Sequence, residues 1–151
     1  MTVVKPTYAG FLLFLRSSVV GFNTTVLPDA EPVIPAAYEN ALQLVNQTIA
    51  TVSGFFYTQA VYMLGADIIC NYAPDQAGQT YFSTLRDKWN VLKFVSGTIQ
   101  WGGDQGTQTS LVVPEAAKMF TLSDLQNLKT PWGRNYLAIA QKYGPSVWGI
   151  T

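Results

Sequence analysis

Apolar side chains recur at helical spacing through most of the first ninety residues. The pattern predicts helices over residues 6–20, 35–52, 55–71 and 79–90. Between the first two, prolines favour an irregular connection; they are Pro28, Pro32 and Pro35, the last of which opens the second helix. The first two-thirds of the chain therefore indicates a helical bundle.

The predicted helix over 55–71 is apolar almost all round, which is typical of the most buried helix of a bundle. Ala60, Gly65 and Ala66 are small enough to let neighbouring helices approach closely. Asp67 is the exception in this apolar stretch. It is either a functional carboxylate or a partly buried acid paired with a basic residue or a backbone N–H, and we favour the structural interpretation.

The pattern changes after Leu92, where apolar and polar residues begin to alternate. This alternation predicts a β-hairpin that pairs Phe94–Trp101 with Thr107–Val113. We expect Gly102, Gly103 and Asp104 to form the turn and, with Trp101, to contact a neighbouring protein. The other interpretation of these glycines, a phosphate-binding loop, is the less favoured one because their spacing does not match such loops. Short helical segments are expected over 114–120 and just after 123.

The C-terminal end combines a clear helix start with an aromatic tail. Thr130 can cap a helix whose first turn holds Pro131, and Gly144-Pro145 ends it. The tail beyond is too short to form a core, yet it is apolar. We therefore expect it to dock on another surface, either its own domain or a partner. Its apolar residues are Val147, Trp148 and Ile150.

Composition points to a protein that buries surface in an assembly. Hydrophobic residues make up 48% of the chain and charged residues 12%, with a formal net charge of zero. The charged share is about half of the roughly 25% that globular domains carry, and a monomer so weakly charged is poorly protected against association. A low-charge monomer is the alternative. Acids predominate up to Asp75 and bases from Arg86 onward, so the two halves could meet across a subunit contact, or the charges could simply be solvated.

The lack of histidine and the single cysteine exclude several kinds of catalytic and metal site. The chain has no histidine and one cysteine, Cys70, so a Cys–His pair, an internal disulfide and a thiolate metal cage are all excluded. We predict no catalytic, cofactor-binding or metal-binding residues and no enzyme activity. The charges are too sparse for tight nucleic-acid binding, no segment reads as a signal peptide or membrane span, and the lone cysteine suits a reducing compartment.

Three segments in this order resemble the head–tail adaptor (connector) proteins of tailed bacteriophages. They are the helix from Ala36 to Asn46, the buried helix from Tyr57 to Asp67, and a Ser/Gly β segment followed by Thr130-Pro131-Trp132-Gly133-Arg134 and the glycine–aromatic tail. In that family the last helix often opens with Thr-Pro-Tyr-Gly, so Trp132 is a conservative departure. Gly65 stands where relatives often have histidine, so any role of that histidine is absent here.

The resemblance implies a mainly α subunit with a hairpin insertion and an extended C-terminal tail. Residues 1–143 would form the adaptor domain, with the hairpin near 94–113, and residues 144–151 the docking tail. Such subunits form rings, typically dodecamers, under the portal protein of the virion. They extend the DNA channel, which DNA passes without specific binding, and dock tail or neck proteins; assembly takes place in the host cytoplasm, away from membranes. Residues expected to bind the portal or a neighbouring subunit are Trp132, Arg134, Tyr143, Val147, Trp148 and Ile150.

Two alternatives stay open. One is another virion ring component, a tail-completion or stopper protein. The other is a small hydrolase using carboxylates, drawn from Asp67, Asp87, Asp104 and Glu115. Paired carboxylates hydrolyse glycosides when they lie roughly 5 to 9 Å apart, and nothing in the sequence places any two of these at that separation.

Overall fold

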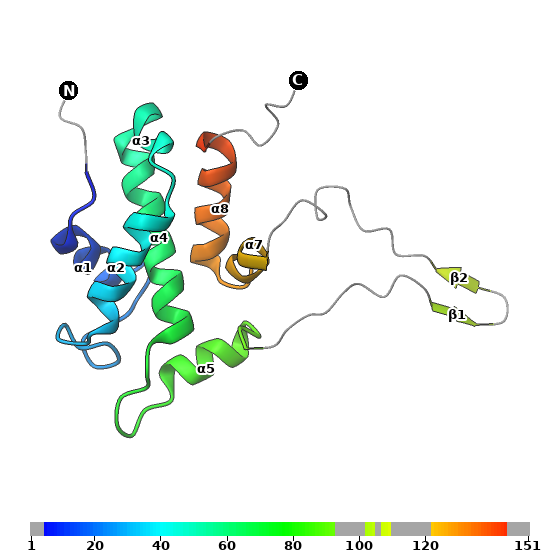
Figure 1. The fold of residues 1–151 in the computed structure, drawn as a ribbon. Coiled ribbons are helices and arrows are strands. Elements are labelled where there is room, and N and C mark those ends of the chain that lie inside the picture. The colour runs from blue at the N-terminus through cyan, green and yellow to red at the C-terminus, as the bar shows by residue number, and fades with distance from the viewer. Residues whose placement is uncertain (1–4, 93–101, 105–106, 110–121, 145–151) are drawn as a thin grey trace.

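Helix α4 (Gly54–Tyr72) runs through the centre of the fold, and the other helices pack around it (Figure 1). The computed structural model describes residues 5–92, 102–104, 107–109 and 122–144. Over these residues the protein is mainly helical, as the sequence predicts. Helices α1, α2, α3, α5 and α8 all contact α4, and this arrangement confirms the expectation that the most apolar helix is the central one.

The start and packing of α4 follow from individual residues. The Ser53 hydroxyl accepts a hydrogen bond from the Phe56 N–H, which caps the first turn. Gly65 leaves room for the Phe11 ring of α1 (Tyr8–Arg16), because a Cβ at Gly65 would lie 2.7 Å from that ring. The small residue predicted to allow close approach therefore does so.

Helix α1 is tied to the loop that follows it by the Arg16 side chain. The guanidinium donates to the carbonyl oxygens of Phe22 at 2.5 Å and Leu27 at 2.8 Å, and it also pairs with the Asp29 carboxylate. These contacts give the proline-rich connection a fixed path back to the bundle, although it has no regular structure of its own.

The prediction of one continuous helix over 35–52 is wrong, because two helices cover this segment. Helix α2 (Val33–Leu44) ends where Val45 becomes extended, and α3 (Thr48–Val52) follows. Between them the Asn46 side-chain oxygen accepts a hydrogen bond from the Thr48 N–H at 2.9 Å. Such a side-chain bond competes with continuation of the helix, and it accounts for the break.

Helix α5 (Tyr81–Lys88) is shorter than the predicted 79–90 but lies where it was expected. The Asp75 carboxylate accepts hydrogen bonds from the N–H groups of Phe82, at 2.6 Å, and Ser83. Arg86 on the same helix donates to the Ala73 carbonyl oxygen at 2.8 Å, which satisfies the C-terminal end of α4.

Helix α8 (Pro131–Tyr143) confirms the predicted start and stop of the last helix. The Thr130 hydroxyl accepts a hydrogen bond from the Gly133 N–H at 3.0 Å, and Gly144 ends the helix. The short α7 (Leu122–Asn127) precedes it. Gly133 is required at this corner, because a Cβ there would clash with the Asn127 carbonyl oxygen.

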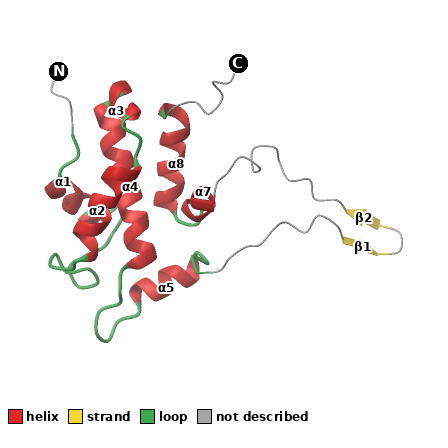
Figure 2. Ribbon diagram, in the orientation of Figure 1, coloured by secondary structure: helices red, strands yellow, loops and turns green. Residues whose placement is uncertain are grey.

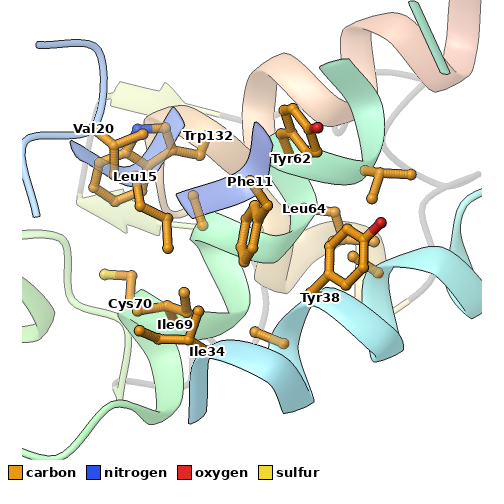
Figure 3. Close-up of a cluster of buried hydrophobic side chains, with 14 of the residues drawn as sticks. Phe11, Leu15, Val20, Ile34, Tyr38, Tyr62, Leu64, Ile69, Cys70 and Trp132 are labelled. Atoms are coloured by element: carbon orange, nitrogen blue, oxygen red, sulfur yellow. The ribbon is translucent and has the colours of Figure 1, made fainter. Parts of the chain in front are cut away.

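The core lies between α1, α2, α4 and α8 and is rich in aromatic rings (Figure 3). Trp132 belongs to it. Only 5% of this side chain is exposed, and its ring packs edge-on against Phe22 and Trp89, with centroids 5.1 and 5.2 Å away. The expectation that Trp132 faces a partner is therefore corrected: the side chain lies in the core of its own chain, and its indole N–H donates to the Val19 carbonyl oxygen at 3.4 Å.

Two short strands, β1 (Gly102–Asp104) and β2 (Thr107–Thr109), pair antiparallel, and in Figure 2 they lie outside the helices. Gly102, Gly103 and Asp104 belong to β1, so the prediction that they form the turn is wrong; Asp104 pairs with Thr107. The hairpin predicted over 94–113 is not supported as a whole, because most of it, Trp101 included, lies outside the described residues.

Candidate functional site

The contact between α4 and α8 buries a carboxyl group, that of Asp67. Asp67 on α4 is only 1% exposed, and its Oδ1 accepts a hydrogen bond from the Thr130 hydroxyl. The same hydroxyl oxygen accepts the Gly133 N–H. Thr130 therefore caps α8 and ties its first turn to the middle of the central helix.

Two carboxamides extend this connection toward α7. The Asn71 side chain, one turn after Asp67, donates its Nδ2 to Asp67 Oδ2 at 3.1 Å. In turn Gln126 on α7 donates its Nε2 to Asn71 Oδ1 at 3.4 Å. A continuous series of side-chain hydrogen bonds therefore joins α7, α4 and α8.

Among the residues that the structure describes, no cation forms an ion pair with Asp67. Burial raises the pKa of Asp67 to about 6, and the hydrogen bonds from Thr130 and Asn71 lower it only in part. Within the described residues the salt bridge is the one between Arg16 and Asp29, far along the chain from Asp67. Asp67 is buried, as the structural interpretation expects, but the partner expected there, a basic residue or a backbone N–H, is wrong: the hydrogen bonds come from the neutral side chains of Thr130 and Asn71.

Asp67 lies in the wall of a cleft of about 520 Å³ where α2, α4, α7 and α8 meet. Carboxamides dominate the polar part of its lining: Asn40, Asn71, Gln126 and Asn127. Asp67 is the one carboxylate among the described lining residues, so this cleft does not bring together the pair that a carboxylate hydrolase needs.

The remaining predicted contact residues are spread over and beyond α8. Arg134 is exposed and donates to the Leu128 carbonyl oxygen at 3.2 Å. Tyr143 is half-buried and stacks on Phe56, with ring centroids 4.4 Å apart and planes 16° from parallel. Outside the described residues lie the tail residues Val147, Trp148 and Ile150. Arg134 and Tyr143 do not line the cleft that holds Asp67.

The lone cysteine is a core residue. Cys70 is fully buried on α4, and burial is the main cause that raises its pKa to about 12, so its thiol is not poised to react. In the part of the chain that the structure describes, no group of histidine, cysteine and acidic side chains could hold a metal ion. None of the described helices has the length and apolar character that crossing a bilayer requires.

No family model, curated protein or solved structure matches this chain. The sequence marked Asp67 as a polar exception and Thr130 as a helix cap, but it gave no sign that the two meet. The cleft was missed altogether. Its only sequence signal is the recurrence of carboxamides at Asn40, Asn71 and Asn127, on segments whose proximity no local pattern reveals.

Proposed function

We propose that this protein is a structural subunit of a tailed-phage head–tail connector that assembles into a ring beneath the portal. The observation that carries the proposal is the combination of few charges with large apolar side chains exposed over several helices. On the helices these include Leu13, Leu44, Val52, Phe55 and Tyr72, and Val19 in the turn after α1 is exposed as well. Single exposed apolar residues are normal, but so many on a chain with 12% charged residues favour burial against other subunits.

The specific assignment to the connector rests on the family resemblance. Two of its segments form helices, α2 and α4, and the third includes the capped start of α8 at Thr130-Pro131. Those observations are in keeping with the resemblance and do not distinguish a connector from another helical ring protein. A tail-completion or stopper protein is therefore the second candidate.

In this proposal the hairpin and the tail make the contacts between proteins. The hairpin near 94–113 contacts an adjacent subunit or a neck protein, and residues 144–151 dock on the portal. The position of β1 and β2 outside the helices supports a role for the hairpin beyond the bundle. The end of α8 at Gly144 supports a tail that needs another surface to bury Trp148.

The first experiment is electron microscopy of the purified full-length chain, alone and mixed with portal rings. We expect rings, formed either by the chain alone or on the portal. A chain that stays monomeric in both conditions contradicts the proposed function. A ring that forms but does not bind the portal favours the stopper alternative.

The change Trp148→Ala tests the docking tail. It should weaken portal binding roughly 30-fold, because truncating an aromatic anchor commonly costs about 2 kcal/mol, and repetition around a ring enlarges the effect. Thermal unfolding of the free variant is the control, and its midpoint should be unchanged. A lowered midpoint with unchanged portal binding would show that Trp148 packs on its own helices.

A further inference from the structure

The end of the bundle where α8 finishes carries apolar side chains that the described residues leave uncovered. Val52, the last residue of α3, is 63% exposed, and Phe55, in the first turn of α4, is 56% exposed. The Phe55 ring meets the Phe56 ring edge-on, with centroids 5.6 Å apart, and Phe56 in turn stacks on Tyr143. Figure 1 shows α3 and the end of α8 at the same end of the molecule. Together these four residues form what we call the apolar end surface.

The sequence that builds this surface carries few charges. From Asn40 to Ala66 it holds no acidic or basic residue, and this stretch includes all of α3 and the first half of α4. Lys142 borders the surface, with its Nζ 5.2 Å from the centre of the Tyr143 ring. A partner that covers α3 and the start of α4 therefore removes apolar area from water without burying a charge of these helices. An uncharged centre with a charge at its edge is the usual composition of a protein interface.

The tail begins at this surface and reaches only a short way from it. Gly144, which ends α8, directly follows Tyr143. Trp148 is the fourth residue after Gly144, so even a fully extended chain takes it at most about 14 Å from Gly144. A protein interface of ordinary size covers roughly 800 Å² on each partner, which is a patch roughly 30 Å across. A partner that buries Trp148 therefore extends over the surface next to Gly144.

We propose that the apolar end surface is a docking site for the same partner that binds the tail, which in the proposed function is the portal protein. The inference rests on that function and deepens it by naming a second contact. Trp148 enters the partner, and Val52 and Phe55 are covered by the partner's surface around it. That surface of the partner is apolar, because no charge on α3 or the start of α4 is present to pair with one of its own.

The first test makes one chemical change at two valines of similar exposure in the full-length chain. Val52→Asp puts a charge into the apolar end surface, whereas Val19→Asp puts it at a residue that is 59% exposed. The Val19 carbonyl oxygen accepts the Trp132 indole N–H, so Val19 lies by the first turn of α8, away from Gly144. Binding to purified portal rings should be weakened about 10-fold or more by Val52→Asp, because an unpaired charge is costly to bury, and less than about 2-fold by Val19→Asp.

A second pair of variants tests the aromatic part of the surface without adding charge. Phe55→Ser should weaken portal binding about 10-fold, as truncation of a buried aromatic contact does. Tyr72→Ser removes a ring that is 75% exposed at the other end of the same helix, and it should change binding less than about 2-fold. Thermal unfolding of each free variant shows whether it is folded.

Two outcomes overturn the docking site and leave the proposed function standing. One is portal binding that Val52→Asp and Phe55→Ser leave unchanged while Trp148→Ala weakens it. The other is an equal loss for Val52→Asp and Val19→Asp, because added charge alone would then explain both.

Other occupants of the surface give results of their own. Loss of rings in the absence of the portal with Val52→Asp assigns the surface to a second copy and overturns the portal as occupant. The tail of the same chain is the occupant if Phe55→Ser and removal of residues 145–151 lower the unfolding midpoint equally and together lower it no further. A wild-type chain that forms no ring with or without the portal contradicts the proposed function as well as this contact.

Discussion

Helices α4 and α8 are joined at two places by opposite kinds of chemistry. Toward the C-terminal end of α8, Tyr143 stacks on Phe56 in a contact between two rings. At its N-terminal end, Thr130 donates to the buried carboxylate of Asp67. One contact gains from removing apolar surface from water, and the other depends on satisfying a charge that has been removed from water.

The two contacts differ in what their loss would leave behind. Loss of the aromatic contact exposes some apolar surface but leaves no group unsatisfied. Loss of the polar contact leaves Asp67 with fewer donors and α8 without its cap. The polar contact also lies beside the cleft, although Asp67 itself is almost fully covered.

The largest expected effect comes from Thr130→Val, which preserves shape and removes the hydroxyl. We expect a loss of about 3 kcal/mol in the free energy of unfolding, because the change removes a helix cap worth about 1 kcal/mol and a hydrogen bond to a buried charge worth about 2 kcal/mol. Urea unfolding measures it. Thr130→Ser keeps the hydroxyl and should lose less than about 1 kcal/mol; equal losses for the two variants would show that the hydroxyl does not matter.

The next effect is a dependence of stability on pH that belongs to Asp67. Its pKa is about 6 in the folded chain against an ordinary value of 3.8, so the folded chain binds more protons between these pH values. Stability from this group therefore falls as pH rises from 4 to 7, by about 2 kcal/mol. Asp67→Asn should lack this loss. Asp75, whose pKa is lowered mainly by the Ser83 hydroxyl, acts in the opposite direction but is present in both proteins.

The difference between the unfolding free energies of wild type and Asp67→Asn, measured at each pH, therefore isolates Asp67. If this difference does not change between pH 4 and pH 7, Asp67 does not have the raised pKa that an unpaired buried carboxylate should have.

The smallest effect is expected at the aromatic contact. Tyr143→Leu should lower the free energy of unfolding by about 1 kcal/mol, the usual worth of a ring–ring contact beyond its area. Tyr143→Phe keeps the ring and should be close to wild type. A loss for Tyr143→Leu larger than that for Thr130→Val would reverse the comparison between the two contacts.

Most of the helical elements could be predicted because their signals are local. The cap at Thr130 with Pro131 and the glycine stop at Gly144 act within one turn of the chain, and they placed α8 correctly. The break after Leu44 was missed because the apolar spacing continues through it, and the Asn46 side chain that stops the helix looks like an ordinary polar residue.

The candidate site could not be predicted because it depends on distant segments. Asp67 and Thr130 are 63 positions apart, and only packing of α8 on α4 brings them together. The same packing buries Trp132 against Phe22 and Trp89, although its place in a tail-proximal segment suggested a contact with a partner. Composition indicated that surface is buried in an assembly, but not which surface.

The most direct test of the uncompensated charge is a titration of the Asp67 carboxyl carbon by NMR in the unassembled subunit, with Asp67→Asn used to assign the signal. We predict a midpoint near pH 6, since burial outweighs the hydrogen bonds from Thr130 and Asn71. A midpoint at or below the ordinary value of 3.8 would show that the carboxylate is already stabilised within its own subunit, and would contradict an uncompensated charge on Asp67.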